Sequence, residues 1–160
     1  MSHRQIEILC ILALHPHGIG LEELHYALYG ERNVSIKTLK AELSQLRSLL
    51  PHSIEPRIYR LSCEVQCDFL SAEQSLNANL ISSTFSLYKG SFLSKSESPL
   101  LSTWRHCFDA RLSQLIYQIK DIDQLLRIIG QTHDRIDAVQ HLLELLPQDS
   151  IHRNYFSNLI

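Results

Sequence analysis

The sequence lacks the features of membrane and secreted proteins. It has no apolar run long enough to span a bilayer and no signal-peptide pattern. Of its four cysteines, Cys63 and Cys67 are spaced C-x-x-x-C, with no second pair and no H-x-x-x-H partner that would favour a zinc site. We therefore expect free thiols, a location in the reducing cytoplasm and no membrane partner.

Motifs of known enzyme chemistry are also missing. There is no G-x-S-x-G, Walker or dinucleotide-binding fingerprint. The nine histidines are dispersed, and none forms a pair with ligand spacing beside an acid. The sequence therefore predicts no catalytic residue, no metal and no cofactor, and a protein that is not an enzyme.

Positive charge is scarce overall but concentrated in one region. The formal net charge is −2, which would argue against a nucleic-acid binder if the charge were evenly spread. From residue 32 to 60, however, six basic residues face two acids, and from 61 to 160 eight basic residues face eleven acids. A basic module joined to an acidic one is the simplest description.

The basic region contains a segment with helical periodicity, residues 35–50. Its apolar residues recur at steps of three and four, which places them on one helical face. Ser35 is a suitable N-cap for this helix. The apolar residues are Ile36, Leu39, Leu43, Leu46 and Leu50.

The opposite face of this predicted helix carries no acid and no large apolar side chain. We predict that Lys37, Thr38, Ala41 and Ser44 face DNA bases, because a helix that enters the major groove touches base edges with its first turns. Lys40 and Arg47 flank the apolar stripe, and we predict that they reach phosphates. Ser35, at the helix start, is also among the predicted DNA-binding residues. The alternative is the solvated polar face of an ordinary core helix.

Two helices are predicted before this segment and a β-hairpin after it. Ser2 and Gln5 suggest a capping box for a first helix, whose apolar stripe is predicted to be Ile6, Leu9, Cys10, Ala13 and Leu14. A second helix ends near Gly30. Residues 54–69 alternate in the manner of a short hairpin, with Arg57 and Arg60 placed to meet phosphates or the minor groove. Exposed edge-strand arginines are the alternative reading of these two residues.

From about residue 71 onward the pattern changes to helices only. Paired helices with short connections suggest stacked helical hairpins. The fold class predicted is therefore mainly α. It comprises a winged helix-turn-helix with a β-hairpin wing at 1–70 and an all-α, tetratricopeptide-like domain for activation or oligomerisation at 71–160.

The segments RQIEILCILALHPHGIGLEELHYALYGE, VSIKTLKAELSQLRSLL and PRIYRL together resemble the OmpR-type winged helix of SARP-like bacterial regulators. In those regulators it precedes a bacterial transcriptional activation domain, which LYKGSFL, LLSTWRHCFDARL and AVQHLLELLPQDS resemble. HSIEPRIY replaces the family's glycine-rich wing tip, and the family's N-terminal sheet is absent. The resemblance therefore suggests a C-terminal piece of a longer regulator.

The resemblance implies that residues 35–50 are the recognition helix and that the hairpin is the wing. The predicted function is sequence-specific DNA binding in transcriptional regulation. Expected partners are double-stranded DNA, a second copy of the chain or an upstream sensory domain, and RNA polymerase. The alternative is a protein-interaction adaptor that never binds DNA. About four phosphate contacts would give a log–log salt slope near −3.6.

Overall fold

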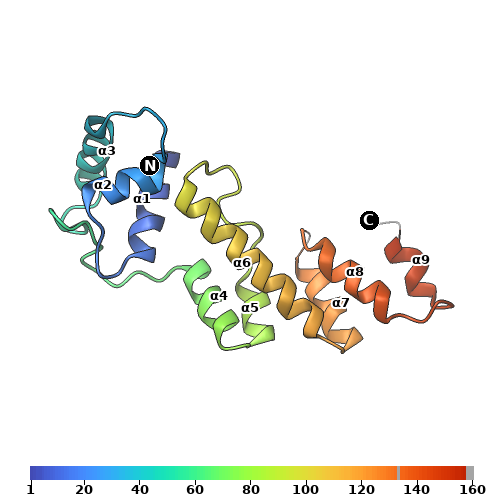
Figure 1. Cartoon of the computed structure of the whole chain (residues 1–160). Coiled ribbons are helices and arrows are strands. Elements are labelled where there is room, and N and C mark those ends of the chain that lie inside the picture. The colour runs from blue at the N-terminus through green and yellow to red at the C-terminus, as the bar shows by residue number, and fades with distance from the viewer. Residues whose placement is uncertain (133, 158–160) are drawn as a thin grey trace. The chain divides into compact units, whose positions relative to one another are not determined.

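The computed structural model describes residues 1–132 and 134–157 and is mainly helical, as predicted (Figure 1). Nine helices form in these residues. The chain divides into two compact units, one of residues 1–66 and 93–105 and the other of residues 67–92 and 106–160. The division at residue 70 into a DNA-binding and an activation domain stays a prediction.

Unit 1, the unit of residues 1–66 and 93–105, contains helices α1 (His3–Leu14), α2 (Leu21–Tyr29) and α3 (Ile36–Leu49). The predicted capping box is confirmed, because the Ser2 side chain accepts from the Gln5 amide at 3.2 Å and the Gln5 side chain accepts from the Ser2 amide at 2.9 Å. α2 ends at Tyr29, and Gly30 caps it with φ of 61°. The three helices contact one another in pairs.

The core of unit 1 is built from one face of each helix. α1 contributes a face different from the one predicted, because its side toward α2 and α3 carries Ile8, Ile11 and Leu12. This helix is apolar on nearly all sides, so its periodicity did not identify the buried face. Each fully buried aliphatic side chain stabilises the unit by about 1.5 to 3 kcal/mol. The other large, fully buried core residues are Ile19, Leu24, Leu28, Leu39, Leu43, Leu46 and Leu101.

The predicted β-hairpin wing is wrong. The described residues contain no β-strand, and the segment 54–61 forms only two isolated antiparallel bridges, Ile19 with Tyr59 and Ile54 with Leu61. Pro56 and the positive φ of Arg57 (75°) interrupt the extended backbone that a longer ladder needs. Residues 62–66 are exposed coil, and α4 begins at Asp68, inside the range predicted as hairpin.

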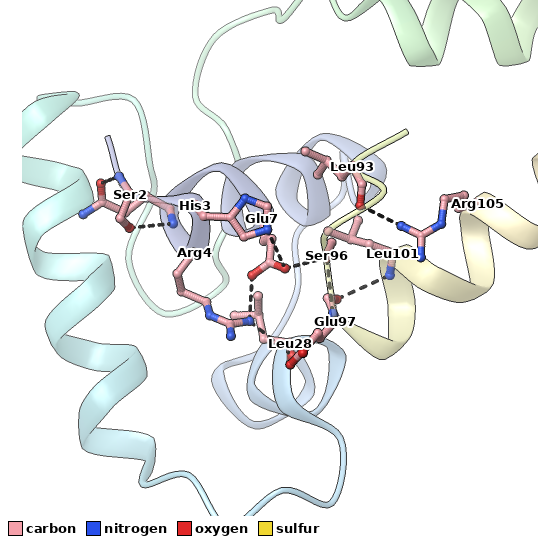
Figure 2. Close-up of polar contacts among 12 residues, drawn as sticks. Ser2, His3, Arg4, Glu7, Leu28, Leu93, Ser96, Glu97, Leu101 and Arg105 are labelled. Carbon is pink, nitrogen blue, oxygen red and sulfur yellow. Dashed lines mark hydrogen bonds and ion pairs between the residues drawn. The ribbon is translucent and has the colours of Figure 1, made fainter. Parts of the chain in front are cut away.

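A segment distant in sequence completes unit 1. Residues 93–98 lie against α1 and α2, where the Ser96 hydroxyl donates to the buried Glu7 carboxylate (Figure 2). The Ser98 hydroxyl donates to the Ala27 carbonyl at 2.7 Å. Arg4 pairs with Glu7 at 2.7 Å, and Arg105 donates to the Leu93 carbonyl at 2.7 Å. These contacts satisfy polar groups that would otherwise be buried without partners.

Unit 2, the unit of residues 67–92 and 106–160, consists of helical pairs. α4 (Asp68–Asn77) contacts α5 (Ile81–Leu87), α7 (Ile122–Gln131) contacts α8 (Ile136–Leu145), and α8 contacts α9 (Ile151–Ser157). In the long helix α6 (Pro99–Gln118), the residues from 106 onward belong to this unit. None of the helices that the structure describes is long and apolar enough to cross a membrane.

Candidate nucleic-acid interface

Helix α3 has the start and the buried face that the sequence predicted. The Ser35 side chain accepts from the Lys37 amide at 3.2 Å, which confirms Ser35 as the N-cap. Leu39, Leu43 and Leu46 are buried. The helix is therefore fixed on one side by core packing, and its other side is available.

The outer face of α3 is exposed along the whole helix. Lys37 and Thr38 lie in the first turn, and Lys40, Ala41 and Ser44 follow, all exposed. No carboxylate of the described residues pairs with Lys37 or Lys40. The small side chains at 41 and 44 leave the helix backbone open to close approach.

The single acid of α3 lies on a different side. Burial raises the pKa of Tyr29 in α2, and the charge of Glu42 adds to this rise while Arg4 opposes it. Glu42 itself is half-buried, and its Oε2 is buried without a hydrogen-bond partner among the described residues, so the side chain does not project from the exposed outer face. The outer face carries positive charge only.

Arg47, near the end of α3, is half-buried. Its guanidinium lies over the Tyr59 ring, with 5.2 Å between the guanidinium carbon and the ring centroid, and its Nη2 donates to the Glu55 carbonyl at 3.1 Å. Its Nε is buried without a hydrogen-bond partner among the described residues. The bridge between Ile19 and Tyr59, with N···O distances of 3.0 and 2.9 Å, holds the tyrosine in place.

The two arginines predicted for the wing lie on the coil of residues 54–61 and differ from each other. Arg57 is exposed at the centre of a tight turn, in which the Ile58 amide donates to the Pro56 carbonyl at 3.1 Å. Arg60 is paired with Glu55, with 2.8 Å between Nε and Oε2. The hydrogen bond and the charge of Glu55 raise the pKa of Arg60. A ligand phosphate would have to compete with Glu55 for Arg60.

A hollow of about 460 Å³ opens between α3 and this coil. Tyr59 and Glu55, which shape the surroundings of Arg47, were not among the predicted site residues. No sequence signal identified them, because each contacts Arg47 only once the chain has folded. The residues that line the hollow are Lys40, Leu43, Ser44, Arg47, Ser48 and Tyr59.

The cysteines and the histidines that the structure describes form no evident site. Cys63 and Cys107 are exposed, and Cys10 and Cys67 are half-buried. Burial raises the pKa of the Cys67 thiol, and the charge of Asp68 adds to the rise, which disfavours a reactive thiolate. Across residues 1–132 and 134–157, no three His, Cys, Asp or Glu side chains are grouped so that they could hold a metal ion.

Comparison with known proteins shows a distant relative of the chain. The chain is 28% identical over 156 residues to an uncharacterized 47.3 kDa protein in the thcA 5′ region of Rhodococcus erythropolis. The match covers 95% of this chain and 36% of the relative, so the chain spans about a third of that protein's length. No family model matches the chain.

These findings correct the predicted family. The resemblance to OmpR-type winged-helix regulators with an activation domain is wrong, since the described residues form no hairpin wing and no family model matches. The short motifs that suggested it also follow from an N-capped amphipathic helix and a following turn, which many folds contain. Any function of the α3 surface therefore depends on the residues that it exposes, without support from a family.

Proposed function

We propose that the chain binds double-stranded DNA in a sequence-specific manner, through the outer face of α3, and regulates transcription. The observation that carries the proposal is the distribution of partners among the cations of unit 1. Arg4, Arg32 and Arg60 are paired with carboxylates at 2.7, 2.7 and 2.8 Å. Lys37, Lys40 and Arg47 of α3 have no such partner among the described residues.

The dimensions of α3 suit the DNA major groove. Its 14 residues correspond to a length of about 21 Å at 1.5 Å per residue. The groove is about 12 Å wide and admits one helix. In this arrangement Lys37, Thr38, Ala41 and Ser44 approach base edges, with the small residues at 41 and 44 allowing close contact.

Side chains on either side of these four base-facing residues then make the phosphate contacts. Lys40 and Arg47 extend from α3, and Arg57 extends from the coil of residues 54–61. Because Arg60 is engaged by Glu55, we expect three contacts in place of the four predicted from the sequence. The log–log salt slope is then about −2.7, at about −0.9 for each contact.

Unit 2 is proposed as the part that binds protein partners. Helical pairs with short connections are common in modules that bind other proteins, and the tetratricopeptide-like arrangement stays a prediction. A weakly charged DNA-binding unit gains affinity when two copies bind neighbouring sites. A second copy of the chain, an upstream sensory domain and RNA polymerase are therefore proposed as protein partners.

A selection from random-sequence duplexes tests the proposal. The purified chain is expected to enrich one motif at two salt concentrations. The double variant Lys37→Ala and Thr38→Ala is expected to bind that motif at least about tenfold more weakly, because each good base contact contributes about 1 to 3 kcal/mol of discrimination. Its affinity for unrelated duplexes should fall much less.

Lys120→Ala is the matched control, since Lys120 is an exposed lysine of unit 2 and should bind as the wild type does. The proposal is contradicted if no motif is enriched and if Lys37→Ala with Arg47→Ala binds duplexes as strongly as the wild type. That result would favour the protein-interaction adaptor.

A further inference from the structure

The hollow between α3 and residues 54–61 combines positive charge, hydroxyl groups and an apolar base. Leu43 is 1% exposed, whereas Lys40 and Ser44 are exposed at the outer side. Lys40, Ser44 and Arg47 follow one another at steps of four and three, so they lie on one face of the helix. Among the described residues, no acidic side chain lines the hollow.

The guanidinium of Arg47 in this hollow is incompletely satisfied. Of its five N–H donors, one group, Nη2, is hydrogen-bonded to a described residue, the Glu55 carbonyl. Its Nε is buried and unpaired within the described chain. A partly buried charge without a counter-ion is unfavourable, so the site favours the arrival of an anion.

Other groups in the hollow are also available for a ligand. The Ser44 hydroxyl has no hydrogen-bond partner in the described residues, and the Ser48 hydroxyl donates to the Ser44 carbonyl at 3.1 Å. The Tyr59 ring lies beneath Arg47, with the guanidinium carbon 5.2 Å from the ring centroid, which favours a guanidinium held over the ring. A planar guanidinium beside a lysine is well suited to the oxygens of a phosphate group.

We propose that this hollow is a seat for one phosphate group, bound by Arg47 and Lys40. The Ser44 hydroxyl is a further donor to a small phosphate ester, whereas on DNA it faces a base edge. Its volume of about 460 Å³ leaves room for the atoms that a phosphate ester carries. The phosphate belongs either to a DNA backbone, in which case the inference rests on the proposed function, or to a small phosphate ester. The chemistry of recognition is the same for both sources.

Thermal unfolding in inorganic phosphate tests the seat. The full chain is heated in rising concentrations of phosphate and, separately, of chloride at matched ionic strength. We expect phosphate to raise the unfolding midpoint of the wild type beyond chloride in a saturable manner, because a ligand that binds only the folded state stabilises it. Lys40→Gln and Arg47→Gln should lose this difference, and Lys37→Gln, on the same helix outside the hollow, should keep it.

DNA binding by the same variants identifies the source of the phosphate. If the group belongs to a DNA backbone, Lys40→Gln and Arg47→Gln should each reduce the magnitude of the salt slope by about 0.9 on a short duplex. If phosphate stabilises the wild type but the chain binds no duplex, the hollow binds a small phosphate ester and the proposed function fails.

The seat is overturned if phosphate and chloride act alike on the wild type and neither variant changes the salt slope. It is also overturned if Lys40→Gln and Arg47→Gln respond to phosphate as the wild type does. DNA binding with an unchanged slope would then leave DNA binding in place but would assign its phosphate contacts to side chains other than Lys40 and Arg47. Should Arg47→Gln fail to fold by circular dichroism, Lys40→Gln decides alone, because Lys40 is exposed and its loss leaves the core unchanged.

Discussion

Arg47 in unit 1 and Arg135 in unit 2 have similar stacking and opposite electrostatic surroundings. Each guanidinium lies over a tyrosine ring, Arg47 over Tyr59 at 5.2 Å and Arg135 over Tyr88 at 6.0 Å. Arg135 is 7% exposed and carboxylates surround it. Arg47 has no carboxylate partner among the described residues.

The partners of Arg135 form a closed network. Its Nε donates to Asp137 at 3.0 Å, its Nη1 lies 3.5 Å from an Asp109 oxygen, and its Nη2 pairs with Asp137 and donates to the Ser113 hydroxyl at 2.8 Å. Ser113 in turn donates to Asp137 at 2.6 Å. Such an arginine holds α6 and α8 together and has little capacity left for a ligand.

The comparison teaches that burial of an arginine does not by itself indicate its role. An arginine with its own carboxylates is part of the fold, and one without them retains donors for an anion. Arg47 belongs to the second kind and Arg135 to the first. Substitutions that treat the two side chains alike should therefore give different results.

The largest expected effect is on stability. Arg135→Met leaves Asp109, Asp137 and Ser113 without their cation, and we expect it to lower the free energy of unfolding by about 3 kcal/mol. Arg47→Met removes one hydrogen bond together with an uncompensated charge, and we expect a loss of about 1 kcal/mol or less. Urea unfolding followed by circular dichroism measures both.

Equal losses in the two variants would break the comparison, because they would mean that Arg47 also acts mainly in the fold. The two substitutions form a matched pair, since each replaces an arginine that stacks on a tyrosine with a side chain of similar length.

A smaller effect is expected at Gly18, which supports the coil beside α3. Gly18 has φ of 93°, and a Cβ there would lie 2.3 Å from Ile58 Cγ2. Gly18→Ala should lower the free energy of unfolding by about 2 kcal/mol, the cost of a strained backbone. Because it displaces the bridge that holds Tyr59, it should also weaken the phosphate response, as followed by thermal unfolding.

Gly20→Ala is the control for this substitution. A Cβ at Gly20 meets nothing within 4 Å, and the loss of a glycine N-cap should cost about 1 kcal/mol or less. A Gly18→Ala protein that is as stable as Gly20→Ala and responds fully to phosphate would show that the coil does not position Arg47.

The smallest effect is expected on the salt dependence of DNA binding. Glu55→Gln releases Arg60 from its ion pair and leaves the Glu55 carbonyl that binds Arg47. We expect a DNA salt slope about 0.9 steeper, as one more phosphate contact forms. Titrations of a duplex at four or more salt concentrations measure it.

Glu64→Gln, a change at an exposed acid in the following coil of residues 62–66, is the control, because it removes the same charge without releasing an arginine. If both variants steepen the slope equally, the effect is one of net charge, and the pair of Glu55 with Arg60 has no specific part in it.

The helical elements of unit 1 were predictable because their signals are local. Ser2 and Ser35 cap the helices that follow them, and the leucine spacing of residues 39–46 identified the buried face of α3. In α1 the same reasoning failed, since apolar residues surround the helix and Glu7 is buried by virtue of Arg4 and a distant serine. Periodicity cannot reveal a partner 89 residues away.

The predicted wing failed for a related reason. Alternation and β-favouring residues at 58–61 and 65–69 are compatible with a hairpin, but a ladder forms only if the two arms pair with each other. Here Tyr59 pairs with Ile19 instead, and the second arm passes into α4. The choice between these partners depends on where α1 and α2 place Ile19.

The sequence alone determined a helical protein with a capped, one-sided helix whose outer face is basic, because caps, periodicity and local charge act over a few residues. Only the tertiary structure decided which cations of the basic region have no carboxylate partner among the described residues. Glu97 engages Arg32 across 65 positions and Glu55 engages Arg60 across a turn, whereas Arg47 is brought over Tyr59 without an acid. Ion pairs depend on distance in space, and distance in space is set by the packing of the whole unit.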